Sequence, residues 1–448
     1  MLWFVYNVLF TVGYVLMLPK FLLRMKRRGG YRRGFMQRFA CYPDALRKRI
    51  RERPRIWVHA VSVGEMFVAQ RYMRDIRAQR PGTGFVLTTT TSTGHRLAEA
   101  RLHADDVLLY YPSDFPLFVR RALATVRPLA LLLTESEIWP NMIRSAADRG
   151  IPVILINGRI SEGSYRGYRA LRVFFGKIVS RVSLALVQSE GDRQRLVALG
   201  GRVERIRVLA SAKYDVAESV AEGEAEARAF LAGLGWRGTV TLLGGSTWPG
   251  EEETLLAIYG RLRGQVPGLR LVLVPRHAER GDDVAAVVRA KGLRPARRSQ
   301  PEAAAVEADP DVLLVDTTGE LRDFYACADV IFVGKSLCST GGQNIIEPAA
   351  LGKPVVVGPH MENFPVVIRD FLDEKALLQV ADARELEAGL RRLVSDPDRR
   401  ASLGKAALKV VESKRGAVAE GVRQILSLIR PAGDDTRPQS PCPAAPDS

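Results

Sequence analysis

The fold of this chain is indicated by the stretch Ile56-Trp57-Val58-His59-Ala60-Val61-Ser62-Val63-Gly64-Glu65, in which an apolar run passes through a turn of small residues to a carboxylate. Residues 66–79 then have the pattern of a helix. A strand, a tight turn with glycine and a helix N-terminus are how an α/β fold builds a ligand site at the carboxyl edge of its sheet. The stretch therefore predicts an α/β domain with a functional site at this turn.

Glu65 is the unusual residue of the turn. Such turns often bind phosphate through free backbone N–H groups, but a carboxylate repels phosphate. The loop is therefore expected to present a base to a neutral group such as a hydroxyl. The structural alternative is that Glu65 caps the helix and interacts favourably with its dipole. The loop sequence is compatible with both roles.

The composition is that of a globular protein with several domains and an anionic partner. With 448 residues, of which 47% are apolar, the chain is expected to form two or three domains. Its four cysteines have no paired spacing, which argues against a disulfide framework and against a zinc site. The net charge of +17 indicates binding to nucleic acid, to a negatively charged membrane or to a phosphorylated substrate.

The segment from Met1 to Leu18 is almost wholly apolar, with Asn7 and Thr11 as its polar breaks. As a helix it would be ~27 Å long, just enough to cross a thinned bilayer. Basic residues follow it, so by the positive-inside rule the rest of the chain is cytoplasmic. A cleaved signal peptide would instead carry basic residues before the apolar run. Residues 1–19 are therefore predicted to be a membrane anchor, followed by the basic residues Lys20, Arg24, Lys26, Arg27, Arg28, Arg32, Arg33 and Arg38.

From Arg55 onward, short apolar runs alternate with amphipathic stretches, which predicts repeated βα units and parallel sheets. The pattern lapses around 211–225, where we place a domain boundary. The expected segments are the anchor, a first domain over 20–215, a second domain over 216–430 and a disordered tail over 431–448. The helical region 398–429 either closes the second domain or crosses back to the first. The active site is expected in a cleft between the carboxyl edges of the two sheets. Predicted strands are 56–60, 85–90, 106–111, 129–134, 152–156, 184–187 and 206–209, then 239–244, 270–274, 312–316, 330–333, 354–357 and 377–380; predicted helices include 66–79, 92–102, 140–149 and 190–199.

The most specific motif of the second half is Gly341-Gly342-Gln343-Asn344-Ile345-Ile346-Glu347-Pro348. A double glycine lets the backbone approach a ligand closely, and a following helix offers N–H groups to a phosphate. Glu347 is able to accept hydrogen bonds from ribose hydroxyls. This arrangement is typical of a nucleotide-sugar site. The chain has no Gly-x-x-x-x-Gly-Lys-Ser/Thr sequence, which argues against a nucleoside triphosphatase.

Three shorter motifs follow other predicted strands of the second half. Residues 244–247 (Gly-Gly-Ser-Thr), followed by Glu251, have the pattern of an anion-facing loop. Arg276, in Pro275-Arg276-His277, either holds a phosphate or carboxylate or is an ordinary solvent-exposed arginine. Lys335 faces either a leaving phosphate or solvent.

In the first half, Glu135-Ser136-Glu137-Ile138-Trp139-Pro140-Asn141 ends a predicted strand and begins a helix with proline in its first turn. Two carboxylates beside an aromatic ring in a cleft need solvent or a cation. Lys213 is a candidate for that cation. Alternatively, Glu137 caps the helix and Lys213 is a solvated hinge residue.

Taken in order, these motifs resemble those of the Kdo transferases of Gram-negative bacteria, which transfer 3-deoxy-D-manno-oct-2-ulosonic acid (Kdo) from CMP-Kdo to lipid A precursors. The resemblance runs from the N-terminal segment to about Phe364, and it includes Gly358-Pro359-His360. The chain departs from the family pattern at Trp248 and Pro249, where a more polar loop containing histidine is expected, and at Lys335, which replaces a glycine.

The resemblance implies a GT-B glycosyltransferase fold of two Rossmann-like domains and an inverting, metal-independent transfer to a lipid A precursor such as lipid IVA in lipopolysaccharide biosynthesis. It implies that Glu65 is the general base and that Glu135 and Lys213 support the transition state. The implied partners are CMP-Kdo, the phosphorylated lipid and the anionic cytoplasmic face of the inner membrane, with no metal or other cofactor. The implied CMP contacts are Pro275, Arg276, Gly319, Glu320, Leu321, Asn344, Ile345, Ile346 and Glu347.

Two other functions are compatible with the same motifs. One is a transferase of the same fold that uses a different nucleotide sugar or acceptor. The other is a non-catalytic basic protein that binds the membrane surface. A nucleic-acid-binding protein is disfavoured, because no aromatic and basic nucleic-acid signature accompanies the charge.

Overall fold

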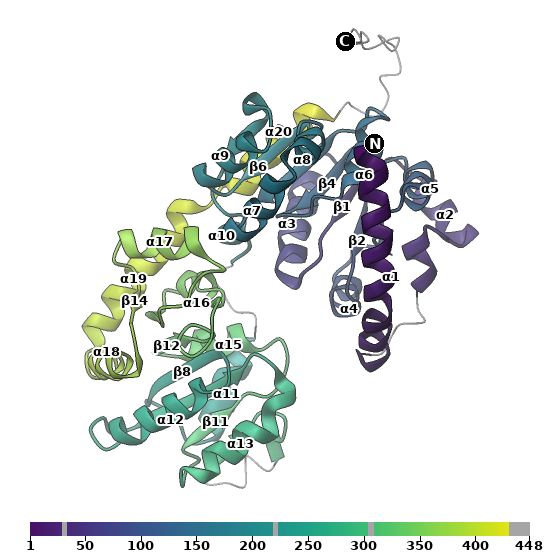
Figure 1. The fold of residues 1–448 in the computed structure, drawn as a ribbon. Coiled ribbons are helices and arrows are strands. Elements are labelled where there is room, and N and C mark those ends of the chain that lie inside the picture. Colours follow the sequence, from purple (N-terminus) through teal and green to yellow (C-terminus); the bar gives the residue numbers. More distant parts are fainter. Residues whose placement is uncertain (29–33, 218–222, 303–308, 430–448) are drawn as a thin grey trace. The chain divides into compact units, whose positions relative to one another are not determined.

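The computed structural model describes residues 1–28, 34–217, 223–302 and 309–429. Arg32, Arg33 and the predicted disordered tail over 431–448 therefore lie outside the described residues. The chain forms two compact units (Figure 1). Unit 1 comprises Met1–Ala212 and the chain from Gly416 onward, and unit 2 comprises Lys213–Arg415.

Unit 1 contains a seven-stranded sheet in the order β3-β2-β1-β4-β5-β6-β7, with every described pair parallel. From β1 the chain adds β2 and β3 on one side, and it then returns to the other side with β4. The order therefore reverses between β1 and β4, and α/β proteins bind ligands at the carboxyl ends of strands at such a switch point. The strands are β1 (Arg55–His59), β2 (Gly84–Thr89), β3 (Val107–Tyr110), β4 (Leu131–Thr134), β5 (Val153–Gly158), β6 (Leu184–Val187) and β7 (Ile206–Val208).

The helices of unit 1 include one from the far end of the chain. Helix α20 (Ala417–Leu428) packs against α3, and Arg80 Nη1 donates a hydrogen bond to the carbonyl oxygen of Ile429 over 3.3 Å. The second domain was predicted to extend to residue 430, whereas the structure assigns this helix to unit 1, because its apolar face is buried there. The other helices are α1 (Leu2–Arg28), α2 (Asp44–Arg51), α3 (Val63–Gln79), α4 (Ser92–Ala100), α5 (Pro116–Val126), α6 (Pro140–Ala147), α7 (Glu162–Ala170), α8 (Arg172–Val179) and α9 (Glu190–Ala198), with 3₁₀ turns η1 (Phe35–Phe39) and η2 (Val203–Arg205).

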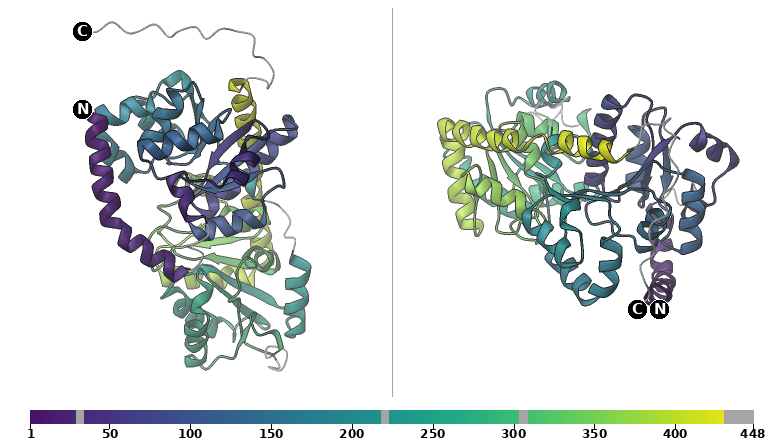
Figure 2. Two further views of the ribbon diagram at one scale, coloured as in Figure 1. Left: turned by 90° about the vertical axis from the view of Figure 1, so that its right-hand side faces the viewer. Right: turned by 90° about the horizontal axis from the view of Figure 1, so that it is seen from above.

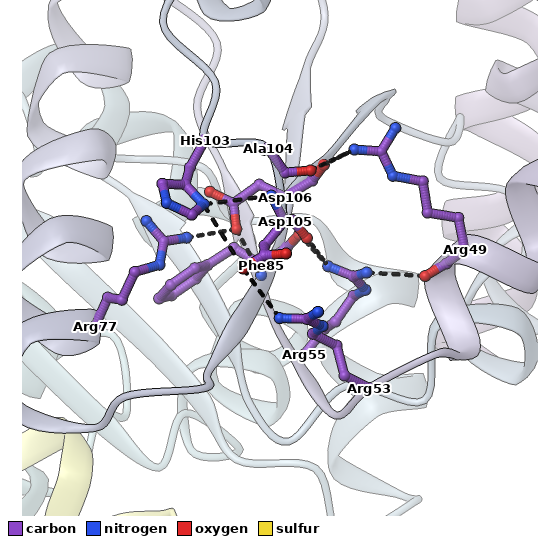
Figure 3. A network of polar contacts seen from close by, with 9 residues as sticks. All are labelled: Arg49, Arg53, Arg55, Arg77, Phe85, His103, Ala104, Asp105 and Asp106. Carbon is purple, nitrogen blue, oxygen red and sulfur yellow. Dashed lines mark hydrogen bonds and ion pairs between the residues drawn. The ribbon is translucent and has the colours of Figure 1, made fainter.

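A polar network closes the amino edge of this sheet, opposite the edge formed by the carboxyl ends of its strands (Figure 3). Arg55 begins β1 with only 2% of its surface exposed, and its guanidinium donates to the carbonyl oxygens of Arg49 and Asp105. It also donates to the carbonyl oxygen of Ile50. Asp106 accepts hydrogen bonds from Arg77 over 2.6 Å and from the backbone N–H of Phe85 over 3.1 Å. Because these buried charges are hydrogen-bonded within the unit, the network is a structural feature of the fold.

Unit 2 repeats the architecture with a seven-stranded sheet in the order β10-β11-β9-β8-β12-β13-β14, again parallel in every described pair. Its switch point lies between β8 and β12. The strands are β8 (Val240–Thr247), β9 (Leu269–Pro275), β10 (Pro295–Arg297), β11 (Val312–Leu314), β12 (Val330–Val333), β13 (Val355–Val357) and β14 (Leu378–Gln379). The helices are α10 (Lys213–Val216), α11 (Glu224–Gly233), α12 (Glu251–Leu262), α13 (Gly281–Ala290), α15 (Leu321–Cys327), α16 (Ile346–Ala350), α17 (Pro365–Asp373), α18 (Ala383–Ser395) and α19 (Pro397–Lys414), with the 3₁₀ turn η3 (Ala278–Arg280).

Each of the thirteen predicted strands corresponds to a strand of the structure, and the four predicted helices named above are present. One strand, β10, was not predicted. It has three residues, Pro295-Ala296-Arg297, at the edge of the sheet, so it carries neither alternation nor an apolar run. The predicted α/β fold class with two Rossmann-like domains is confirmed.

Helix α1 runs along the outside of unit 1 (Figure 2, left). By length and composition, its segment Leu2–Leu23 is the one helix of the described residues that would be able to cross a membrane.

Candidate active site

Glu65 lies at the switch point of the first sheet, in the first turn of α3. Ser62 is the N-cap residue, and its hydroxyl accepts a hydrogen bond from the backbone N–H of Glu65 over 3.2 Å. Oε2 of Glu65 accepts from the N–H of Val61 over 3.0 Å and from the hydroxyl of Thr134 over 2.8 Å. Glu65 therefore does contribute to capping the helix, as the structural alternative held. Among the described residues, no hydrogen bond reaches Oε1, so one oxygen is anchored while the other remains for a second role.

Thr134 is the residue that fixes this carboxylate. It ends β4 beside β1, it is fully buried, and its hydroxyl also lies 2.9 Å from the carbonyl oxygen of His59. Sequence reasoning missed Thr134. The available signal was a polar residue that ends an apolar strand, Leu131-Leu132-Leu133-Thr134, beside a switch point.

His59 and Glu137 form a second pair at the same edge. The ring of His59 is buried and stacks on Tyr111 with ring centres 3.7 Å apart, and its Nε2 lies 3.6 Å from Oε2 of Glu137. The same oxygen of Glu137 accepts a hydrogen bond from Trp139 Nε1 over 2.7 Å. Burial, together with the nearby carboxylates of Asp114 and Glu137, raises the pKa of Tyr111 well above its usual value. Glu137 thus has partners within unit 1.

Glu135 follows β4 directly and has a left-handed backbone, with φ of +50°. Asn157, at the end of the neighbouring strand β5, has φ of +51°, and its Nδ2 lies 3.4 Å from Oε1 of Glu135. Left-handed conformations cost energy in residues other than glycine, and they gather at functional sites. The structure therefore brings Glu65 and Glu135 to one edge of the first sheet. Lys213 belongs to unit 2, where it begins α10 and its Nζ lies 5.5 Å from the centre of the Phe364 ring.

At the switch point of the second sheet, a buried carboxylate ties two loops together. Glu251, the first residue of α12, is fully buried. Its Oε2 accepts from the N–H groups of Trp248 over 2.9 Å and Lys335 over 2.8 Å, and its Oε1 accepts from those of Ser336 over 2.9 Å and Leu337 over 3.0 Å. The loop after 244–247 does face an anion, but that anion is the chain's own Glu251.

In the loop over 341–347, several backbone N–H groups are also hydrogen-bonded within the chain. The N–H of Gly341 donates to Glu362, that of Gly342 to the carbonyl oxygen of Lys335, and that of Ile346 to Oδ1 of Asn344. Helix α16 has only five residues and has Ile345 as its N-cap. The N–H of Ile346 is therefore already hydrogen-bonded within the loop, and the binding of a phosphate by this helix stays a prediction.

Polar and charged side chains gather at this edge of the sheet. Asn344 Nδ2 donates to Oε1 of Glu347 over 2.9 Å. Burial raises the pKa of Glu347, and Asn344, Arg322 and Arg276 oppose that shift. Arg276 follows Pro275 at the end of β9, and its side chain is exposed. Arg276 and Arg322 therefore supply positive charge beside Asn344 and Glu347. Arg322 was not among the predicted contacts, although it is adjacent to one of them.

The predicted contacts at 319–321 lie at the start of α15. Gly319 has φ of +103°, Glu320 is the N-cap residue and Leu321 begins the helix. The carboxylate of Glu320 accepts from Arg298 Nε over 2.9 Å and from the hydroxyl of Thr317. The carboxylate of Glu320 is thus already hydrogen-bonded to other residues of unit 2.

The two departures from the family pattern lie next to each other. Nζ of Lys335 is 4.7 Å from the centre of a ring of Trp248, in cation–π geometry. Lys335 has φ of +57°, a conformation that glycine adopts without strain. The described residues contain no group of three or more His, Cys, Asp and Glu side chains that could hold a metal ion.

Comparison with known proteins accords with this architecture. Residues 33–216 match the 3-deoxy-D-manno-octulosonic-acid transferase (kdotransferase) family, and residues 281–410 match the glycosyl transferases group 1. A solved glycosyltransferase from Rickettsia africae has a TM-score of 0.57 at 10% identity, covering 85% of this chain and 99% of that one. At this identity the likeness concerns the fold alone, which is of the GT-B type.

Two relatives show the family. A 3-deoxy-D-manno-octulosonic acid transferase of Haemophilus influenzae is 31% identical over 410 residues, which cover 91% of this chain and 92% of the relative. A 3-deoxy-D-manno-octulosonic acid transferase of Bordetella pertussis is 37% identical over 372 residues, covering 81% of this chain and 84% of the relative. On this similarity, together with the two parallel sheets and their switch-point loops, the chain belongs to the 3-deoxy-D-manno-octulosonic acid (Kdo) transferase family of glycosyltransferases.

Proposed function

We propose that this chain transfers Kdo from CMP-Kdo to a phosphorylated lipid A precursor such as lipid IVA, with inversion at the sugar and without a metal ion. Unit 1 binds the acceptor and unit 2 binds the donor. The observation that carries the proposal is the Glu65 carboxylate at the first switch point, with Oε2 held by Val61 and Thr134 and with Oε1 outside that hydrogen bonding.

In the proposed reaction, Oε1 of Glu65 removes the proton from an acceptor hydroxyl. The hydroxyl oxygen forms a bond to the anomeric carbon of Kdo, while the bond from that carbon to the phosphate oxygen breaks and CMP leaves with the electron pair. Attack opposite the leaving group inverts the configuration, and one positioned carboxylate is sufficient for such a step. Glu135 and Lys213 are proposed to support the charge that develops in the transition state.

The donor side is proposed to rely on fixed positive charge. Cytidylate leaves as a stable anion, and Arg276 and Arg322 beside Glu347 supply charge to hold it. The proposed donor contacts are Pro275, Arg276, Gly319, Glu320, Leu321, Asn344, Ile345, Ile346 and Glu347. A net charge of +17 suits an acceptor with two phosphates, presented at the anionic cytoplasmic face of the inner membrane.

The test is incubation of the purified full chain with CMP-Kdo and a tetraacylated, diphosphorylated lipid A precursor, followed by mass spectrometry of the lipid. The expected product is heavier by one or more Kdo units. No mass gain with CMP-Kdo would refute the proposed reaction. A gain only with a UDP- or GDP-sugar offered in parallel would support a transferase with another donor.

A further inference from the structure

Helix α1 has two faces of different chemistry. The side chains that turn towards unit 1 recur every three or four residues, as they do along one face of a helix. They are Trp3, Tyr6, Asn7, Phe10, Tyr14 and Phe21, and each is partly buried.

Polar contacts hold the first half of the docked face. The hydroxyl of Tyr6 donates to Oδ2 of Asp114 over 2.9 Å, and Nδ2 of Asn141 donates to Oδ1 of Asn7 over 2.7 Å. Asp114 is fully buried, and it also accepts from the backbone N–H groups of Asn141 and Met142. The helix thus completes a buried polar cluster of unit 1.

Aromatic contacts continue the docking along the helix. Trp3 packs against Phe174 with ring centres 5.2 Å apart, and Phe10 packs against Phe115 at 5.0 Å. The hydroxyl of Tyr14 lies 3.1 Å from that of Ser113. The guanidinium of Arg38 lies 5.4 Å from the ring centre of Phe21.

The opposite face of α1 is apolar and exposed. Leu16 and Phe4 are each 73% exposed, and Leu9 is 65% exposed. On the helices that contact α1, Val173 of α8 is 71% exposed and Leu117 of α5 is 55% exposed. The exposed apolar residues of this face are Phe4, Val5, Val8, Leu9, Val12, Val15, Leu16, Leu22 and Leu23.

We propose that α1 lies in the plane of an anionic membrane, with this outer face among the acyl chains and unit 1 against the surface, rather than crossing the bilayer. The docking contacts run from Trp3 to Phe21, a distance of ~27 Å along the helix. A crossing helix would either carry Asp114, Ser113 and Asn141 into the hydrocarbon, which is costly for polar groups, or lose every one of these contacts. An amphipathic helix in the interface keeps the contacts and still buries its apolar face.

Charge complementarity identifies the partner as an anionic lipid surface. The helices that hold α1 also expose basic residues, among them Arg120 and Arg121 on α5 and Arg172 on α8. Each basic side chain near an anionic leaflet contributes attraction. The inference rests on the membrane location in the proposed function, and it adds the orientation of the helix.

The test is the depth of three outer-face positions in vesicles of phosphatidylethanolamine and phosphatidylglycerol. In the full chain with its four cysteines replaced by serine, single cysteines at Val5, Val12 or Leu23 carry a fluorophore, and lipids with quenchers at two depths report its position. These residues lie within about 20° of one another around the helix and span ~27 Å along it. A cysteine at the exposed Arg74 of α3, in the same unit but away from α1, is the matched control.

An in-plane helix gives the same shallow depth at all three positions, with no quenching at position 74 and weaker binding to vesicles without phosphatidylglycerol. Val5 and Leu23 near opposite surfaces, with Val12 deeper than both, would overturn the proposal, as would the absence of quenching at all three. Kdo transfer is measured with the same variants in the same vesicles. Because depth is read without turnover, loss of the proposed orientation and loss of the proposed function are separate outcomes.

Discussion

Replacing Glu65 by glutamine separates the capping role of this side chain from its proposed role as the base. The carbonyl oxygen of glutamine is able to take the place of Oε2 and accept from both Val61 and Thr134, while its amide nitrogen takes the place of Oε1. The variant therefore keeps both hydrogen bonds, but it loses the negative charge that strengthens them and that interacts with the helix dipole. We expect a decrease of about 1–2 kcal/mol in the free energy of unfolding.

The effect on catalysis is expected to be larger. A positioned general base contributes ~10²–10⁴-fold to a rate, so Glu65→Gln should raise the barrier by about 3–5 kcal/mol. CMP binding should be retained, because the proposed donor contacts lie in unit 2. The assay follows CMP release and lipid mass, with urea unfolding of the same preparations.

A matched control removes the cap but keeps the carboxylate. Ser62→Ala deletes the hydroxyl that accepts from the N–H of Glu65, which should cost ~1 kcal/mol of stability and leave the rate within a few-fold of the unmodified enzyme. A rate for Glu65→Gln within tenfold of the unmodified enzyme would refute the assignment of Glu65 as base. Equal losses of activity in the two variants would show that only helix capping matters.

Four further outcomes are expected. Thr134→Val keeps the shape but removes the hydroxyl that holds Oε2 of Glu65, so turnover should fall about tenfold with a stability loss of ~1 kcal/mol. Burial raises the pKa of Asp114 from 3.8 to about 7, so between these pH values the native state keeps a proton that the unfolded state has lost. The free energy of unfolding should therefore fall as pH rises through this range, by at most about 1.4 kcal/mol per pH unit. Asp114→Asn should flatten this slope, as measured by urea unfolding at a series of pH values. Glu251→Gln turns an amide N–H group towards backbone N–H donors. The free energy of unfolding should therefore fall by ~2 kcal/mol or more, and calorimetry should show weaker binding of CMP. Addition of EDTA should leave the rate of Kdo transfer unchanged.

Each of these expectations has a contrary result. An unchanged turnover for Thr134→Val would mean that the carboxylate needs no fixing from β4. A slope in Asp114→Asn equal to that of the unmodified chain would assign the pH dependence to other groups. Glu253→Gln, on the exposed side of the same helix, is the control for Glu251, and equal effects of the two would contradict the role of the buried carboxylate. Loss of activity in EDTA, restored by a divalent ion, would contradict metal-independent transfer.

The strands were predictable because a parallel sheet is covered on both faces, so its strands appear as continuous apolar runs. Strand β10 lacks such a run and was missed. The helix after the double glycine was predicted without bounds, and in the structure this helix, α16, has only five residues and ends at Ala350. Helix α20 has an ordinary amphipathic pattern, which carries no information about the sheet on which it packs.

The partners of the site residues were not predictable from spacing. Thr134 is 69 residues from Glu65, and the two meet only because β4 lies next to β1 in the sheet. Glu251 has the pattern of a residue that favours a helix N-terminus, and nothing local indicates that it accepts from the loop after β12, 84 residues further on. In both cases the order of the strands in the sheet brings together residues that are far apart in the sequence.

The amino-acid sequence by itself determined the two series of βα units, the apolar first segment and the loops that carry polar side chains, because periodicity and turn residues act over a few neighbouring positions. The tertiary structure decided which groups those side chains meet: Thr134 at Glu65, the backbone of two loops at Glu251, and Asp114 and Asn141 beneath α1. Hydrogen bonds and packing between distant segments depend on the order of strands and on which helix face is covered. For that reason an apolar helix that is long enough to span a membrane is, in the folded chain, held along one face by contacts with its own domain.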